Sequence, residues 1–195
     1  MRIVLASGSP RRRELLEQIG IRAEVIPSSV EEKVTSTVPG KVVLELSGQK
    51  AEDVAGKLTG TDVLVIGADT VVSAGGRILG KPGSEKEAQE MIRSLAGTSH
   101  QVYTGVSLIY RDREGAEKRT AFAEKTDVFV YPMDEEEILS YAGCGEPMDK
   151  AGAYGIQGRL AAYVEKIDGD YNNVVGLPVG MLYQEIKRLT GGWNR

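Results

Sequence analysis

The stretch Val63-Leu64-Val65-Ile66-Gly67-Ala68-Asp69-Thr70 decides the fold of this 195-residue chain. Its first six residues are a continuous apolar run, which is typical of a strand buried on both faces of a sheet. Asp69 and Thr70 follow the run directly, and ligands of open α/β sheets bind at the carboxyl ends of their strands. The stretch therefore predicts an α/β sheet and also the place of its functional site.

Helical and strand patterns alternate on both sides of this stretch. Pro10, Pro39 and Pro178 each open a helical pattern, because proline fits the first turn of a helix, and Ser9 is the expected N-cap of the first of these helices. Ser84, with Glu87 in capping-box spacing, and Asp134 are expected to cap two more. Strands are expected at 3–6, 21–27, 77–79, 102–110, 122–131 and 161–167, with 102–110 and 122–131 as an antiparallel pair. No segment has the composition of a linker, so the pattern predicts one mixed α/β domain over residues 1–195.

Charge and composition exclude several classes of protein. A net charge of −4 indicates that nucleic acid is not a partner, because nucleic-acid binders usually carry a basic excess. Cys144 and His100 are the only residues of their types, which excludes an intrachain disulfide and disfavours a zinc site. This composition favours a reducing, cytosolic setting. No stretch approaches the roughly 20 apolar residues of a membrane helix.

The segment Ser7-Gly8-Ser9-Pro10-Arg11-Arg12-Arg13 places three cations in the first turn of a helix. The helix dipole disfavours cations there by roughly 0.3–1 kcal/mol each. A bound phosphate removes this conflict, since both the free N–H groups of a helix start and guanidinium groups bind anions. The hydroxyls of Ser7 and Ser9 add further donors. The alternative is a solvated basic helix start, whose arginine stems cover apolar surface.

Four further side chains are candidates for phosphate or metal binding. The Asp69 carboxylate is suited to hold Mg²⁺ or to orient a water, unless it only caps a turn. Lys50 falls on the inward face of its helix, where it either reaches back to solvent or points into a site. Lys81 suits a phosphate-binding point charge, although it is equally an ordinary surface lysine. Glu32, in the polar loop at 28–40, either binds a metal or is solvated.

The glycine-rich segment 144–160 has no clear period and is long for a loop, which is typical of functional loops. Gln157 offers both a donor and an acceptor, as the recognition of a base edge requires. Tyr154 either stacks on a base or packs in the core. Several cations together with a carboxylate suit a polyphosphate, whose chemistry depends on positioning and charge neutralisation. The chain has no Walker A pattern, so it is not a P-loop enzyme.

Taken together, these motifs closely resemble the Maf family of nucleoside triphosphate pyrophosphatases. The matching stretches run in order through the chain: Ala6-Ser7-Gly8-Ser9-Pro10-Arg11-Arg12, Glu14-Leu15-Leu16, Gly67-Ala68-Asp69-Thr70-Val71-Val72, Gly80-Lys81-Pro82, Thr104-Gly105-Val106, Glu146-Pro147, Asp149-Lys150-Ala151-Gly152-Ala153-Tyr154-Gly155-Ile156-Gln157-Gly158, Gly169-Asp170-Tyr171 and Asn173-Val174-Val175-Gly176-Leu177-Pro178. So many ordered matches are far more specific than any single motif. The resemblance implies a bent mixed β-sheet with flanking helices and two lobes around a cleft, similar to inosine triphosphate pyrophosphatase.

The resemblance also implies an activity and residue roles. The activity is hydrolysis of a nucleoside triphosphate to the monophosphate and pyrophosphate. Asp69 matches the family's catalytic acidic residue, taken as the general base, and Arg11, Thr70 and Gln157 match positions linked to substrate choice. The form of residues 153–158 resembles the subfamily that acts on dTTP and UTP, including modified pyrimidines.

The sequence thus predicts a cytoplasmic dTTP/UTP pyrophosphatase. Its expected substrate-binding residues are Ser7, Ser9, Arg11, Arg12, Lys50, Thr70, Lys81 and Gln157, and Asp69 with Glu32 is expected to hold Mg²⁺ or Mn²⁺. The family suggests a homodimer, although no apolar surface stripe in the sequence indicates one. The alternative is a nucleotide-binding regulator of cell division or septum formation, in which hydrolysis is incidental.

Overall fold

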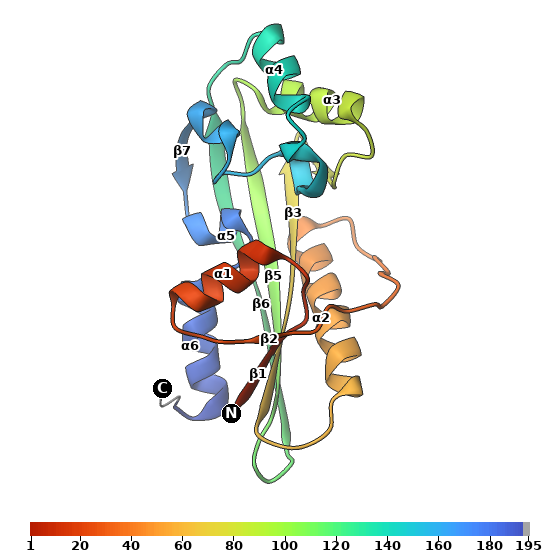
Figure 1. The fold of residues 1–195 in the computed structure, drawn as a ribbon, viewed down its shortest axis with the longest axis vertical. Coiled ribbons are helices and arrows are strands. Elements are labelled where there is room, and N and C mark those ends of the chain that lie inside the picture. Colours follow the sequence, from red (N-terminus) through yellow and green to blue (C-terminus); the bar gives the residue numbers. More distant parts are fainter. Residues whose placement is uncertain (193–195) are drawn as a thin grey trace. The chain divides into compact units, whose positions relative to one another are not determined.

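The fold is described for residues 1–192 by a computed structural model, in which the chain forms two compact units (Figure 1). Unit 1 comprises Met1–Asp69, Thr104–Glu124 and the residues from Gly176 onward. Unit 2 comprises Thr70–Tyr103 and Lys125–Val175. The predicted arrangement of two lobes around a cleft stays a prediction.

One mixed sheet runs in the order β2-β1-β3-β5-β6-β7, with β4 paired to β3. Strand β1 is parallel to β2 and to β3, whereas the pairs β3–β4 and β6–β7 are antiparallel. The strands are β1 (Arg2–Leu5), β2 (Glu24–Val25), β3 (Val63–Ala74), β4 (Arg77–Leu79), β5 (Ser99–Arg111), β6 (Glu117–Val130) and β7 (Val164–Asp168). The predicted mixed α/β class is therefore confirmed.

Helices flank this sheet, and the predicted helical patterns are confirmed. The α-helices are α1 (Pro10–Gln18), α2 (Pro39–Lys57), α3 (Glu85–Leu95), α4 (Glu135–Ala142), α5 (Tyr171–Val175) and α6 (Val179–Thr190). Three short 3₁₀ helices, η1 (Glu146–Asp149), η2 (Ala151–Ala153) and η3 (Arg159–Tyr163), occupy most of the segment that the sequence indicates as a long loop. No helix among residues 1–192 is both long and apolar enough to cross a membrane.

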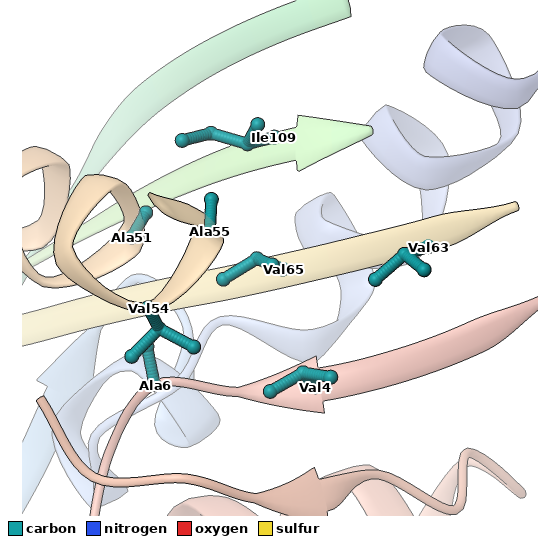
Figure 2. Packing of buried hydrophobic residues seen from close by; sticks show 8 residues of the cluster. All are labelled: Val4, Ala6, Ala51, Val54, Ala55, Val63, Val65 and Ile109. Carbon is teal, nitrogen blue, oxygen red and sulfur yellow. The ribbon is translucent and has the colours of Figure 1, made fainter. Parts of the chain in front are cut away.

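The core of unit 1 lies between α2 and the strands β1, β3 and β5. Its apolar cluster consists of Val4, Ala6, Ala51, Val54, Ala55, Val63, Val65 and Ile109, all buried (Figure 2). Figure 1 shows α2 on one side of the unit 1 strands and α1 with α6 on the other. The apolar run from Val63 is therefore covered on both faces, as its composition predicts.

Two glycines allow α2 to approach the sheet closely. A Cβ atom at Gly67 would lie 2.2 Å from the carbonyl oxygen of Ser47, and one at Gly105 would lie 2.3 Å from that of Val43. Both distances are far inside van der Waals contact, so only glycine fits at either position. The helix backbone thus rests directly on β3 and β5, and the buried hydroxyls of Ser47 and Ser107 hydrogen-bond across this contact at 2.9 Å.

Strand β3 corrects the predicted place of Asp69. The apolar run was expected to end at Ala68, but β3 continues to Ala74, because Val71 and Val72 extend it and β4 pairs with its last residues. Asp69 therefore lies within β3 and not at its end. Its neighbour β1 does end here, since the last β1 pair joins Leu5 to Ile66. Asp69 was expected at the carboxyl end of a strand, and the strand that ends beside it is β1, not β3.

Other local predictions were also wrong in extent. The strand expected at 21–27 is only Glu24–Val25, which pairs with Val4 and Leu5 of β1. Helix α5 was not predicted. The side chain of Ser9 accepts no capping hydrogen bond from the described residues, although Ser9 is the N-cap of α1. At α3, Ser84 Oγ accepts from Glu87 N as expected, but Glu87 Oε2 accepts from Gly83 N and so does not complete the capping box.

In unit 2, buried polar side chains are paired between elements. His100 is fully buried, and its Nε2 lies 2.7 Å from the hydroxyl of Tyr154, which is also buried. The core alternative for Tyr154 is therefore the correct one. Asn173 Nδ2 donates to Val102 O at 3.1 Å and to Thr126 Oγ1 at 3.0 Å, so α5 is tied to β5 and β6.

Substitution of Gly67 tests the close approach of α2. We expect Gly67→Ala to lower the free energy of unfolding by about 3 kcal/mol, because its Cβ overlaps helix backbone that cannot move without opening the core. A matched control is Gly56→Ala in α2 itself, where, apart from the adjoining residues and the backbone of the helix, no heavy atom of the described chain lies within 4 Å of the new Cβ. That variant is expected to gain up to about 1 kcal/mol, since alanine is the better helix former. Urea denaturation measures both, and equal effects would contradict the packing described.

The burial of His100 predicts a pH dependence of stability. Burial lowers the pKa of His100 from 6.5 to about 4, and the Asp127 carboxylate only partly opposes this shift. Between these values the unfolded chain binds a proton that the folded chain excludes, so the free energy of unfolding falls as the pH is lowered from 6.5 to 4. The expected loss is about 3 kcal/mol.

The variant His100→Gln separates this loss from that of titrating carboxylates. It keeps a polar partner for Tyr154 but cannot take up a proton in this range. Urea denaturation of both proteins between pH 7 and 4 should show a steeper decline for the wild type. If the free energy of unfolding fell equally with pH in both proteins, the pKa of His100 would not be lowered in the folded state.

Candidate functional site

The candidate site in unit 1 starts where β1 passes into α1. Ser7 is buried, and its Oγ accepts from Ser9 N at 3.3 Å and from an Arg12 guanidinium nitrogen at 2.9 Å. The Nε of Arg12 also donates to the carbonyl oxygen of Gly176 at 2.9 Å. Arg12 therefore joins the start of α1 to the segment before α6, and two hydrogen bonds in different directions fix its guanidinium plane.

Cations are crowded at this helix start. Burial lowers the pKa of Arg12, the charge of Asp69 opposes this shift, and the charge of Arg11 adds to it. The first turn of α1 contains no acidic residue. An anion bound here would relieve the repulsion between the two arginines, as the sequence predicts. Arg13 is different, because it is exposed and its nearest carboxylate partner is Glu17, one turn along the same helix, at 3.7 Å.

Lys50 lies between two carboxylates. Its Nζ is 2.5 Å from Asp69 Oδ1 and 2.9 Å from Glu32 Oε1. The side chains of Lys50 and Asp69 are 17% and 14% exposed, whereas that of Glu32 is 48% exposed. The structure therefore brings together three of the predicted residues, from α2, from β3 and from the polar loop before α2. The Lys50 ammonium is turned toward these two carboxylates, and its role in a binding site stays a prediction.

The donor set of Glu32 and Asp69 fits a divalent cation that arrives with a polyphosphate. Mg²⁺ is usually bound by one or two carboxylates together with substrate phosphate oxygens. Within residues 1–192, no three His, Cys, Asp or Glu side chains are grouped so as to hold a metal by themselves. The two carboxylates already converge on one cationic centre, the Lys50 ammonium. A metal at this position stays a prediction.

The polar loop that carries Glu32 is fastened along one face of α2. Three helix residues at four-residue spacing hold it, and we call residues 28–36 the strap. Asp53 accepts from Ser28 and Ser29, Gln49 exchanges two hydrogen bonds with the backbone of Lys33, and Glu45 accepts from Thr35. Hydrogen bonds from Lys57, Ser28 and Ser29 lower the pKa of Asp53 to about 2, so its carboxylate stays charged. The strap therefore has a fixed course, although the sequence predicts only a polar loop.

The remaining predicted residues lie in unit 2. Thr70 follows Asp69 in β3 and is partly buried, whereas Lys81 and Gln157 are both exposed. A hydrogen bond of 2.9 Å from Gly152 N to Gly80 O joins the segment of Lys81 to that of Gln157. Gly152 has a φ of 67°, and a Cβ there would lie 2.8 Å from the side chain of Val72. The segments that carry Lys81 and Gln157 are thus joined by a hydrogen bond between their backbones.

Several residues that shape the site were not predicted. Glu45, Gln49 and Asp53 recur every four residues on α2, a signal that the sequence does contain, because such residues share one helix face. Glu146 lies in a stretch that matches the family, but no periodic signal indicates that it organises the segment around Gln157. Its neighbours in sequence do not reveal that the carboxylate turns toward its own loop.

Comparison with known proteins places the chain in a family. Residues 2–189 match the family described as Maf-like protein. A dTTP/UTP pyrophosphatase of Agathobacter rectalis is 52% identical over 198 residues, which cover 96% of this chain and 97% of the relative. A dTTP/UTP pyrophosphatase of Carboxydothermus hydrogenoformans is 52% identical over 187 residues, covering 96% and 98%. Among solved structures, the Ham1 protein of Staphylococcus aureus is similar with a TM-score of 0.47 and 17% identity, covering 67% of this chain and 72% of that chain.

Arg12 and Arg13 offer a matched pair of substitutions. Arg12→Lys keeps the charge but cannot make both hydrogen bonds, to Ser7 and to Gly176, so we expect a loss of about 1–2 kcal/mol in the free energy of unfolding. We also expect weaker binding of inorganic triphosphate, measured by calorimetry. Arg13→Lys, at the exposed neighbouring position, should change neither quantity appreciably. Equal effects of the two variants would show that Arg12 is only another surface cation.

Proposed function

Because this chain belongs to the Maf family, we propose that it is a nucleoside triphosphate pyrophosphatase that hydrolyses dTTP and UTP to the monophosphate and pyrophosphate. The structural observation that supports this function is the placement of Asp69. The carboxylate of Asp69 is held beside the Lys50 ammonium and within the field of Arg12. A carboxylate among cations suits the activation of water next to a polyphosphate.

The phosphate groups are bound by cations and hydroxyls. Arg11 and Arg12 neutralise phosphate oxygens at the start of α1, where the helix N–H groups also point. The hydroxyls of Ser7 and Ser9 complete this part, and Lys50 and Lys81 act as point charges. Phosphoryl transfer requires little more from the protein than such positioning and neutralisation.

Glu32 and Asp69 are the proposed ligands of Mg²⁺ or Mn²⁺. A bound divalent cation supplies neutralisation of the phosphate charge and acidification of a bound water. Asp69, or the neighbouring carboxylate, accepts a proton from the attacking water. The water oxygen forms a bond to the α-phosphorus, the bond from that phosphorus to the bridging oxygen breaks, and pyrophosphate leaves with the bond electrons. Lys50 keeps Asp69 oriented through its ion pair.

Gln157 and Thr70 are the proposed readers of the pyrimidine, and modified pyrimidine triphosphates are included among the substrates. An amide offers one donor and one acceptor, which match the N3–H and a neighbouring carbonyl of uracil or thymine. The exposure of Gln157 is consistent with a residue that meets its partner only in a ligand.

Composition also bears on the cellular setting of the enzyme. The single cysteine and the acidic net charge support a cytoplasmic enzyme that acts on a small molecule and not on nucleic acid. A homodimer is proposed from the family alone. No observation favours the alternative, a regulator of cell division in which hydrolysis is incidental, whereas the relatives are named as enzymes.

Asp69→Asn tests the enzymatic role. We expect pyrophosphate release from dTTP and UTP, with Mg²⁺ or Mn²⁺ present, to fall by about 10²–10⁴-fold, because an amide cannot accept the proton of the attacking water. Calorimetry should still detect triphosphate binding, since the arginines remain. Asp168→Asn, at an exposed carboxylate on β7, is the matched control and should keep full activity. Near-normal turnover by Asp69→Asn would refute the assignment, and binding with retained signalling but no turnover would favour the regulator.

A further inference from the structure

The side chain of Glu146 lies at the centre of residues 144–163, which we call the Gln157 loop. Its Oε1 accepts from the hydroxyl of Tyr141 at 3.0 Å, and its Oε2 accepts from the backbone N–H of Arg159 at 3.0 Å. Both bonds lie within unit 2. One carboxylate thus joins the end of α4 to the backbone two residues after Gln157.

Two glycines let the backbone of the loop approach this carboxylate and its neighbour. A Cβ atom at Gly158 would lie 1.9 Å from Glu146 Oε1, and one at Gly155 would lie 2.7 Å from the Cε of Lys150. The ammonium of Lys150 donates to the carbonyl oxygen of Glu146 at 2.7 Å. Glu146 and Gly158 therefore form a matched pair, because the carboxylate occupies the space that any other residue at 158 would need.

Gln157 is exposed, but the residues on both sides of it are anchored. Ile156 and Leu160 are buried, and Tyr154 is held by His100 at 2.7 Å. A hydrogen bond from Gly158 N to Gly155 O closes a turn around Gln157. The backbone that carries Gln157 is therefore fixed, and Glu146 holds it at the N–H of Arg159, two residues further on.

We propose that Glu146 is a positioning residue for base selectivity, which acts by fixing the turn that presents Gln157. The inference rests on the proposed function, because it assumes that Gln157 reads the base. It assigns no contact between Glu146 and the substrate. A carboxylate suits this place since its two neighbours are both donors, a phenol O–H and a backbone N–H, and each oxygen accepts one of them.

Substitutions at Glu146 have graded consequences. Glu146→Ala removes both acceptors, so the turn loses its link to α4. Glu146→Gln still accepts from Arg159 N, and its NH₂ group can donate to the Tyr141 oxygen, so it restores both contacts without charge. Tyr141→Phe removes the bond to Oε1 and the backbone hydrogen bond from Gly155 to the Tyr141 oxygen, and leaves the bond from Arg159 to Glu146.

The experiment compares pyrophosphate release from dTTP with that from dATP. We expect Gln157→Ala and Glu146→Ala each to lower the ratio of kcat/KM for dTTP over dATP by about tenfold or more, because hydrogen-bond readout of the base is lost. The double variant should lower the ratio no further, since both changes act on the same amide. Glu146→Gln should keep the ratio within a few-fold of wild type, and Tyr141→Phe should lie between.

Two readouts separate positioning from mere stability. Affinity for inorganic triphosphate, which has no base, should be unchanged in Glu146→Ala. Hydrogen exchange of the Arg159 amide should be faster in that variant and close to normal in Glu146→Gln. If Glu146→Ala does not fold, Tyr141→Phe and Glu146→Gln still give the ratio and the exchange rate.

The outcomes also separate the two proposals. A wild-type protein that releases no pyrophosphate from dTTP or UTP would refute the proposed function and the inference with it. An active wild type whose ratio falls in Gln157→Ala but not in Glu146→Ala or Tyr141→Phe would overturn the inference alone. Additive losses in the double variant would also overturn it, because Glu146 would then act by another route.

Discussion

The contact between the backbone of α2 and Gly67 of β3 is the constraint on which the site of unit 1 depends. Because no side chain separates helix and strand there, Lys50 on α2 comes within ion-pair distance of Asp69, two residues after that glycine. A larger residue would push the helix outward and carry the lysine with it. The strap moves with α2 as well, so the second carboxylate, Glu32, depends on the same contact. Packing in the core thus fixes the distances between charged groups at the surface.

Carboxylates organise loops in both units by accepting hydrogen bonds from them. Asp53 holds the start of the strap through two donors from the loop, and Glu146 holds the Gln157 loop through a phenol and a backbone N–H. In each case the acid saturates donors that would otherwise need water. This use of acidic residues explains part of the negative net charge of a protein proposed to bind a polyanion. The loops have defined courses, although their sequences have no helical or strand period.

Most helices and strands were predictable because their signals are local. Proline at helix starts and the apolar run at 63–68 identify their elements directly. The length of β3 was not predictable in this way, because β4 stabilises its second half through pairing. The residues around the site were named mainly from the family resemblance. Glu146 belongs to one of the matching stretches, but its role was not predicted, since its partners are a backbone N–H and a tyrosine on another element. Long-range acceptors of this kind leave no periodic trace in a sequence.

The matched fit of Glu146 and Gly158 has an evolutionary consequence. A side chain at position 158 would need the space of the Glu146 carboxylate, so the effect of a substitution at 158 is expected to depend on the residue at 146. Position 157 is exposed, so its side chain is not constrained in this way by packing. Selection, or a directed library, can therefore exchange that one side chain on an unchanged scaffold. The base preference that we propose for position 157 could then change while the proposed phosphate chemistry on α1 and β3 stays under separate constraint.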